Sequence, residues 1–182
     1  LMQRYRRAVQ RHLYFHGSRR TYLAKNASYA TLSASLASAF PDARIIACLR
    51  EPGAVVSSQL SSLKPALTAI HGPIRTDEFN TRMLRQLHLA YTRLLQVLPS
   101  AAAHRAAFLP LTAQRTGLAE AIRQLYDYLK IPMSDAYAAR LDTLAVRARH
   151  HRSSHRHTLC THNLTETAIK AQFADIEAAF DF

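Results

Sequence analysis

Residues 44–63 decide the fold, and they read Arg-Ile-Ile-Ala-Cys-Leu-Arg-Glu-Pro-Gly-Ala-Val-Val-Ser-Ser-Gln-Leu-Ser-Ser-Leu. The apolar run at 45–49 is too short for a helix and begins with β-branched residues, so it predicts a strand buried on both faces, as in parallel sheets. Pro52 suits the first position of a helix because its missing N–H would be unpaired there. Arg50 is therefore expected at the carboxyl end of a strand, directly before a helix N-terminus. That position in an α/β sheet favours a bound phosphate.

The rest of the chain predicts an alternation of strands and helices. Strands are expected at 21–24, 45–49 and 106–111, with Pro110 at an edge or a strand end. Helices are expected at 1–16, 30–40, 54–63, 81–98, 117–130 and 134–148. A last helix begins near Asn163 with Glu166 completing a capping box, and its expected buried face is Ile169, Phe173, Ile176 and Phe180. Residues 64–79 contain three breakers and are expected to form a loop, in the role of a lid. This order predicts an α/β fold with a right-handed parallel sheet, in one domain spanning residues 1–182.

The charge of the chain predicts an anionic partner without choosing one. The formal net charge is +12 over 182 residues, which fits nucleic acid, acidic glycan, anionic lipid or a phosphorylated nucleotide. Cys48 and Cys160 are expected to be free thiols, the first in the buried strand and the second in a polar loop. No apolar run approaches the roughly 18 residues of a membrane span, and no secretory signal is recognisable, which favours a cytoplasmic protein. The chain begins with Leu1 in a helical pattern, so we expect a piece of a longer protein, truncated at its N-terminus.

Short motifs in the first third of the chain carry a family resemblance. They are Lys25-Asn26, the run Phe-Pro-Asp-Ala-Arg at 40–44, and Arg50-Glu51-Pro52 followed by Ser57-Ser58. In this order the chain resembles a sulfotransferase that uses 3′-phosphoadenosine 5′-phosphosulfate (PAPS). That family commonly has Lys-Asn-Pro at a strand end, Phe-Pro-Asp-Ala at a helix exit, and Arg-x-Pro with a serine eight residues after the arginine, which here is Ser58.

Later segments agree with the same resemblance. Residues 108–129 are similar to the family's strand, Asp-Leu loop and Tyr-x-x-Leu helix, and Ile131-Pro132 closes that unit. Residues 155–159 and 163–166 resemble its segment near the C-terminus. The resemblance therefore covers almost the whole chain from about residue 22 onward.

The resemblance implies a fold, a reaction and a set of residues. The fold would be a three-layer, P-loop-like arrangement of a small parallel sheet flanked by helices, with a helix-rich C-terminal half. The whole protein would move a sulfonyl group from PAPS to a hydroxyl or amine acceptor and release 3′,5′-adenosine bisphosphate. Arg50 and Ser58 would bind the 3′-phosphate of the nucleotide, with Ser57 in that role if the register is one residue earlier. Lys25 would be the catalytic cation near the sulfonate.

Other positions stay open within this resemblance. His155 or Arg156 would close over the nucleotide, against the alternative of a solvated basic loop. His88 is expected to be a core-edge histidine, with general base as its alternative. The family's phosphosulfate-binding loop has no equivalent, because 17–21 resembles it superficially and predicts a turn. We therefore expect this chain alone to bind the nucleotide poorly and to be inactive.

Two other functions compete with this interpretation. A non-catalytic basic module would use the arginines at 4–11 and 147–156 to bind nucleic acid or another anionic polymer. Nucleic acid is the weaker choice because Tyr5 is the only Tyr, Phe or Trp interleaved with those arginines. A P-loop nucleotide kinase would need a Gly-rich loop ending in Lys-Ser/Thr, which the sequence lacks. No metal is expected, since the histidines at 150, 151, 155 and 157 fit no standard zinc spacing.

Overall fold

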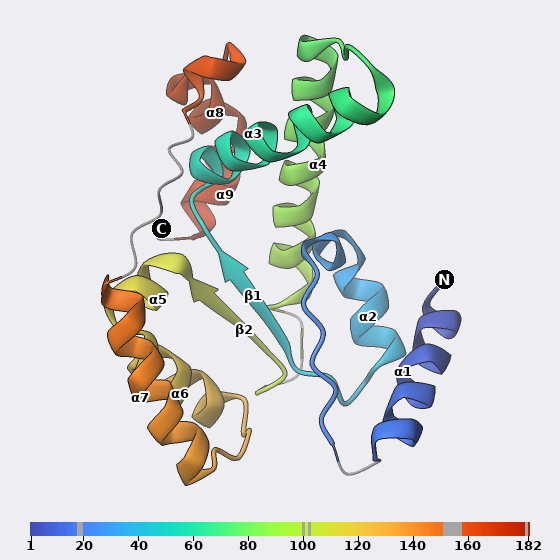
Figure 1. The fold of residues 1–182 in the computed structure, drawn as a ribbon, viewed down its shortest axis with the longest axis vertical. Helices are drawn as coiled ribbons and strands as arrows, with labels where there is room; N and C mark the ends of the chain where they lie inside the picture. The colour runs from blue at the N-terminus through green and yellow to red at the C-terminus, as the bar shows by residue number, and fades with distance from the viewer. Residues whose placement is uncertain (18–19, 100, 102, 151–157, 181) are drawn as a thin grey trace.

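The computed structural model describes residues 1–17, 20–99, 101, 103–150, 158–180 and 182. Two strands and a larger number of helices make up this part of the chain (Figure 1). The strands are β1 (Ile45–Leu49) and β2 (Ala106–Pro110). The α-helices are α1 (Met2–His16), α2 (Ser33–Ala39), α3 (Pro52–His71), α4 (Thr76–Val97), α5 (Leu111–Thr116), α6 (Leu118–Tyr128), α7 (Asp135–His150), α8 (Glu166–Gln172) and α9 (Ala174–Ala179). Two 3₁₀ helices, η1 (Ala27–Leu32) and η2 (Cys160–His162), complete the described elements.

The two strands form a parallel sheet, as the sequence predicts. The register runs from Ile45 opposite Ala106 to Leu49 opposite Pro110. A parallel pair needs a long connection between its strands, and here α3 and α4 supply it. Pro110 ends its strand, the place that its missing N–H favours. Both strands point their carboxyl ends toward the region of α3, α8 and α9 (Figure 1).

One face of the sheet carries the main core. Ala47 and Leu49 of β1 and Ala106 of β2 pack with buried side chains from helices α3, α4, α8 and α9. The most deeply buried of these are Val56, Leu60, Ile169, Phe173 and Ile176, each no more than 1% exposed. Phe173 lies between α8 and α9, so a single aromatic side chain anchors both short C-terminal helices. Burial of this apolar area is the main stabilising contribution to the fold.

The opposite face of the sheet is covered over β2 but open over β1. Leu109 of β2 packs with Leu125 and Leu129, at the end of α6. The register places Ile46 and Cys48 of β1 on this same face, yet Ile46 is 37% exposed and Cys48 is exposed. The prediction of a strand buried on both faces, with Cys48 inside, is therefore wrong for this chain. A run of apolar residues shows only that a strand can be buried. The positions of the packed helices decide which of its faces is covered.

Side chains that precede the two strands form hydrogen bonds with carbonyls at nearby helix ends. Arg44 Nε donates to the Leu129 carbonyl at 2.6 Å, and Arg105 donates to the Phe40 carbonyl at 3.2 Å. His104 Nδ1 is 2.6 Å from the Tyr128 carbonyl, which can only accept, so this nitrogen carries the proton. These three side chains donate to carbonyls that helix ends leave without partners.

Two predicted elements before β1 differ from the structure. Residues 21–26 are extended but belong to no strand, although the segment runs beside β1 toward η1 in Figure 1. The helix expected at 30–40 is divided into η1 and α2. Asn26 accounts for the start of η1, because its side chain accepts a hydrogen bond from the Ser28 N–H at 3.0 Å.

The loop predicted at 64–79 is mostly helical, and this prediction is wrong. Helix α3 continues through Pro65 to His71, and α4 already begins at Thr76. Proline removes one helical hydrogen bond and usually ends or kinks a helix. Here the preceding turns of α3 are held by the fully buried Val56 and Leu60, and the helix tolerates the lost bond. The turn is confined to the residues around Gly72, which has a φ of 78°.

The C-terminal helix begins later than predicted. Thr165, not Asn163, is the N-cap of α8, and its side chain accepts from the Ala168 N–H at 3.2 Å. Asn163 has a left-handed conformation with a φ of 57° and ends η2 instead. The predicted buried positions Ile169, Phe173 and Ile176 are confirmed. Helix α5 was not predicted from the sequence.

Phe173→Ala is expected to lower the free energy of unfolding by about 3–5 kcal/mol, because it leaves a cavity where four helices meet. Phe15→Ala is the matched control, since Phe15 is 82% exposed and should change stability by no more than about 0.5 kcal/mol. Urea unfolding followed by circular dichroism measures both. Equal effects of the two substitutions would contradict the core described here.

Candidate functional site

The turn from β1 to α3 presents an arginine to solvent on a fixed backbone. Arg50 is exposed and directly follows β1, and Pro52 is the buried first residue of α3. Proline at this position leaves no N–H without a partner. The predicted place of Arg50, at a strand end before a helix N-terminus, is confirmed.

A tyrosine from α4 holds this turn. The hydroxyl of Tyr91 donates to the carbonyl of Arg50 at 2.5 Å, and its side chain is buried next to the ring of Phe173. Burial raises the pKa of Tyr91 from 10.0 to about 12, and the hydrogen bond and charge of Arg50 offset only part of this. Tyr91 is therefore a neutral donor over the physiological range of pH, and it positions the backbone of Arg50.

A carboxylate lies at the same helix end. Glu51 is the N-cap of α3, and a Cβ placed on Gly53 would lie 3.1 Å from Glu51 Oε1. The carboxylate therefore folds over the first turn of α3, where the helix dipole favours a negative charge. An anion that binds at this helix end has to share the positive field with Glu51.

The two candidate serines differ in their surroundings. Ser57 is 5% exposed, and its hydroxyl donates to the Ala54 carbonyl at 3.3 Å within α3. Ser58 is half-buried, six residues after Pro52, so it lies about 9 Å along the helix from that residue. Of the two side chains, Ser58 is the more accessible from outside.

Lys25 comes from a separate part of the chain. It is exposed in the segment before η1, and no hydrogen bond or ion pair among the described residues joins it to Arg50 or Ser58. The structure thus places Arg50 directly before α3 and Ser58 within that helix, and it leaves Lys25 on the separate segment 21–26. His155 and Arg156 lie outside the described residues.

A buried polar network attaches the segment after residue 157 to the candidate site. His162 is 7% exposed, with Nε2 2.9 Å from the Ser61 hydroxyl of α3, and its carbonyl accepts from the Asn80 amide at 2.8 Å. Leu159 approaches the start of the same helix, with Cδ1 3.9 Å from a Cβ placed on Gly53. The C-terminal segment is therefore fixed beside α3.

His88 has a structural role in the described contacts. Its Nε2 lies 3.0 Å from the Asp175 carboxylate of α9, and its ring packs edge-on against Phe173. Desolvation alone would raise the pKa of the Asp175 carboxyl, but the contact with His88 outweighs it, so this pKa is lowered. The expectation of a core-edge histidine agrees with these contacts. Among the described residues, no three His, Cys, Asp or Glu side chains are grouped to hold a metal ion.

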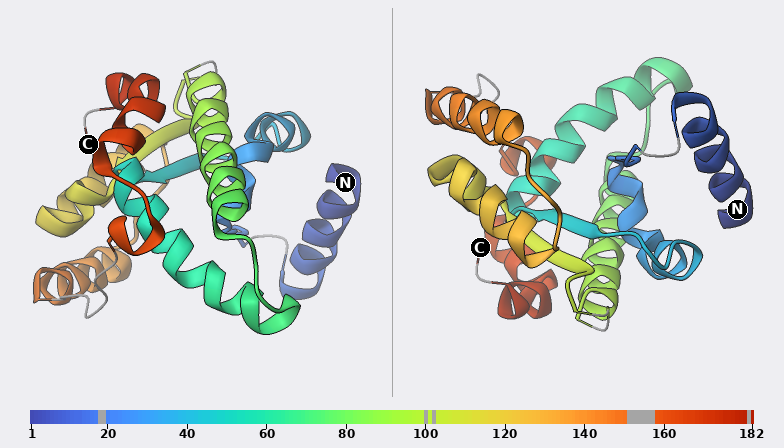
Figure 2. Two further views of the ribbon diagram at one scale, coloured as in Figure 1. Left: turned by 90° about the horizontal axis from the view of Figure 1, so that it is seen from above. Right: turned by 90° about the horizontal axis from the view of Figure 1, so that it is seen from below.

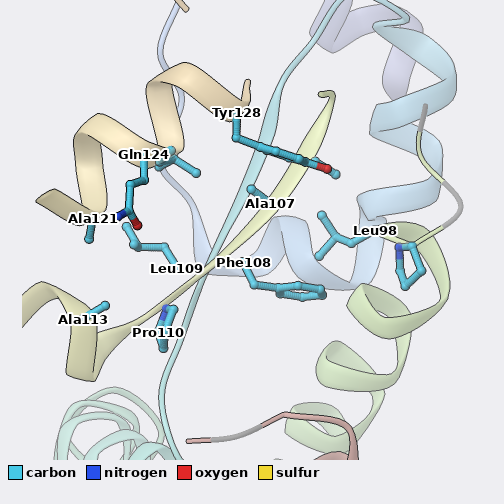
Figure 3. A pocket seen from close by; sticks show the side chains of 12 residues that line it. Leu98, Ala107, Phe108, Leu109, Pro110, Ala113, Ala121, Gln124 and Tyr128 are labelled. Atoms are coloured by element: carbon cyan, nitrogen blue, oxygen red, sulfur yellow. The ribbon is translucent and has the colours of Figure 1, made fainter. Parts of the chain in front are cut away.

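A cavity of the described structure lies away from the candidate site. It has a volume of about 580 Å³ and follows β2 on the side away from β1, between the end of α4 and helix α6 (Figure 3). Its walls are apolar, with Tyr128 and Gln124 at one side (Figure 3). Arg50 and Ser58 do not line this cavity.

Sequence reasoning missed Tyr91 and Glu51 as parts of the site. Tyr91 falls at helical spacing within the apolar pattern of 81–98, and an aromatic residue at such a position predicts packing and says nothing of its hydroxyl. Glu51 follows Arg50 directly, and an acid next to a predicted helix N-terminus was a usable signal. The partner of Tyr91 is 41 residues away in sequence, so no local pattern reveals it.

Comparisons with known proteins identify relatives of this chain. A family model described as "Sulfotransferase family" matches residues 1–135. The fold is similar to that of the sulfotransferase STF9 from Mycobacterium avium, with a TM-score of 0.71 at 20% sequence identity. That match covers 85% of this chain and 40% of STF9, and it confirms the predicted α/β fold class. No protein with a curated description matches the sequence. In the described part of the chain, no helix is long and apolar enough to cross a membrane.

Tyr91→Phe is expected to lower the free energy of unfolding at neutral pH by about 1–2 kcal/mol, because the Arg50 carbonyl loses its donor. The pKa of Tyr91 is about 12 in the folded protein, against 10.0 for an unperturbed tyrosine. The stability that the neutral Tyr91 side chain contributes is therefore fully present below pH 10, and it is lost as the pH rises toward 12. The difference between wild type and variant should therefore narrow over that interval in urea titrations.

Tyr14→Phe serves as the control for this substitution, because Tyr14 is 91% exposed and should leave stability unchanged at every pH. A difference for Tyr91→Phe that stays constant from neutral pH to pH 12 would contradict the burial that raises the pKa of Tyr91.

Proposed function

The chain belongs to the sulfotransferase family, and we propose that it carries the part of a PAPS site that binds the 3′-phosphate of the nucleotide. In the reaction that we infer, an acceptor oxygen or nitrogen attacks the sulfur of PAPS. The bond from sulfur to the 5′-phosphate oxygen breaks, 3′,5′-adenosine bisphosphate leaves, and the acceptor's proton passes to a base. This displacement needs positioned cations around the transferred group.

The position of Arg50 is the observation that carries this proposal. Its guanidinium is exposed at the carboxyl end of β1, while its own carbonyl is held by Tyr91. A guanidinium offers a planar fork that matches a phosphate dianion. A fixed backbone lowers the entropy that such a side chain loses when it binds.

The other candidate residues have supporting roles in this proposal. Ser58 offers a hydroxyl on the side of α3, so the 3′-phosphate would lie beside the first turns of the helix and not only at its tip. The buried hydroxyl of Ser57 is already used within the helix, which favours Ser58. Lys25 would approach the transferred sulfonate from the neighbouring segment, and His155 or Arg156 would cover the nucleotide.

Activity of the whole protein is part of the proposal. The chain spans 40% of the length of the solved sulfotransferase that it matches. Residues 1–182 contain no Lys/Arg-Ser-Gly-Thr loop for the 5′-phosphosulfate, so we infer that this chain binds the nucleotide weakly and does not transfer a sulfonyl group by itself.

Arg50→Ala is expected to weaken binding of 3′,5′-adenosine bisphosphate at least tenfold, which corresponds to about 1.4 kcal/mol. Calorimetric titration of the 182-residue chain measures it. Adenosine 5′-monophosphate lacks the 3′-phosphate, so its affinity should be the same for wild type and variant. Equal losses for both nucleotides would mean that Arg50 does not contact the 3′-phosphate.

Arg85→Ala is the matched control, since it removes the same charge from an exposed position on α4 and should leave both affinities unchanged. Ser58→Ala is expected to weaken bisphosphate binding more than Ser57→Ala. Tighter binding of random oligonucleotides than of the bisphosphate would support the competing non-catalytic basic module.

Glu51→Gln is expected to strengthen binding of 3′,5′-adenosine bisphosphate by about two- to fivefold, because it removes a negative charge from the helix end where the phosphate would lie. Glu166→Gln makes the same change in the first turn of α8 and should not alter the affinity. Weaker binding by Glu51→Gln would show that the carboxylate supports the nucleotide site instead of competing for it.

A further inference from the structure

The first 41 residues carry an unbalanced positive charge. They contain seven arginines and lysines and no aspartate or glutamate, since the first acidic residue of the chain is Asp42. The whole chain has a net charge of +12, so more than half of its excess positive charge lies in these 41 residues. None of the ion pairs in the described structure involves it.

Helix α1 places part of this charge on one exposed face. Arg4, Arg7, Arg11, Tyr14 and Phe15 are all exposed, and at 3.6 residues per turn they lie within an arc of roughly 100°. We call these five residues the outer face of α1. They form one stripe, with the cations along the helix and both aromatic rings at its C-terminal end.

The opposite side of α1 attaches it to the protein. The ring of Tyr5 lies 5.6 Å from those of Tyr29 and Phe40, and Val9 is 8% exposed. Helix α1 lies at the margin of the molecule in Figures 1 and 2, next to α2. The outer face is thus directed away from the described core, and nothing in the described contacts covers it.

The aromatic residues distinguish the ligand of this face. Tyr14 is 91% exposed and Phe15 is 82% exposed, so both rings are available to a partner that can bury them. A sulfated polysaccharide would neutralise the arginines but offers no apolar surface to bury the rings, and a single-stranded nucleic acid would offer only its bases for stacking. A phospholipid surface does both, because its phosphates attract cations and its acyl boundary accepts aromatic rings.

We propose that the outer face of α1 docks on an anionic phospholipid membrane, with the helix lying in the plane of the interface. The arginines would contact lipid phosphates while Tyr14 and Phe15 insert between headgroups. Figure 1 shows α1 separated from the turn between β1 and α3, so membrane contact and nucleotide binding would use different surfaces. This inference does not depend on the proposed function.

Co-sedimentation of the 182-residue chain with vesicles tests the proposal. We expect binding to vesicles of phosphatidylserine and phosphatidylcholine in equal parts, weakened by salt, and little binding to pure phosphatidylcholine. Replacing Arg4, Arg7 and Arg11 together by glutamine should weaken binding about a hundredfold. Tyr14→Ser with Phe15→Ser, which keeps every charge, should weaken it about tenfold.

The matched control removes three exposed arginines from other faces, with Arg85, Arg93 and Arg140 changed to glutamine. This variant has the same net charge as the α1 variant and should bind almost as the wild type does. Circular dichroism and urea unfolding confirm that each variant stays folded, since all of the changed side chains are exposed.

Three results would overturn the proposal. One is no binding to anionic vesicles, and another is equal loss of binding in the control and the α1 arginine variant, which would indicate net charge alone. The third is unchanged vesicle binding by the Tyr14→Ser/Phe15→Ser variant together with tighter binding of an oligonucleotide or a sulfated polysaccharide, which would identify a soluble polyanion as the ligand.

Discussion

The hydrogen bond from the Tyr91 hydroxyl to the Arg50 carbonyl links the core of this protein to its candidate site. Tyr91 is also a member of the core cluster that contains Phe173 and the buried side chains of α3, α4, α8 and α9. The strand end that presents Arg50 is therefore held by the same helix that closes the main face of the sheet. A polar contact of this kind, in a buried environment, contributes more than its exposed counterpart because an unpaired carbonyl there would be costly.

Positive charge in this chain is used in two different ways. Arg44 and Arg105 lie at the beginnings of the strands and donate to backbone carbonyls, so they stabilise helix ends. Arg50 and the arginines on the outer face of α1 are exposed instead, and no ion pair of the described structure involves them. Cations without carboxylate partners retain their attraction for external anions.

The C-terminal segment completes the surroundings of α3 through polar contacts as well as apolar ones. His162 joins Ser61 of α3 and Asn80 of α4, while Ile169 and Phe173 bury the apolar side of the same region. Residues more than 80 positions apart thereby determine what can approach the start of α3. Glu51 adds a local constraint, because its carboxylate already lies in the positive field of that helix end.

The sequence by itself determined the parallel strand pair, the helix faces with Ile169 and Phe173, and the place of Arg50, because apolar periodicity and proline position act locally. It did not determine that β1 is covered on one face only, that α3 continues through Pro65, or that 21–24 is unpaired, since these depend on which elements pack together. In the candidate site, Arg50 and Ser58 could be named from spacing, but Tyr91 could not. Only the tertiary structure decided its hydrogen bond, because α4 and the strand end meet in space and not in sequence.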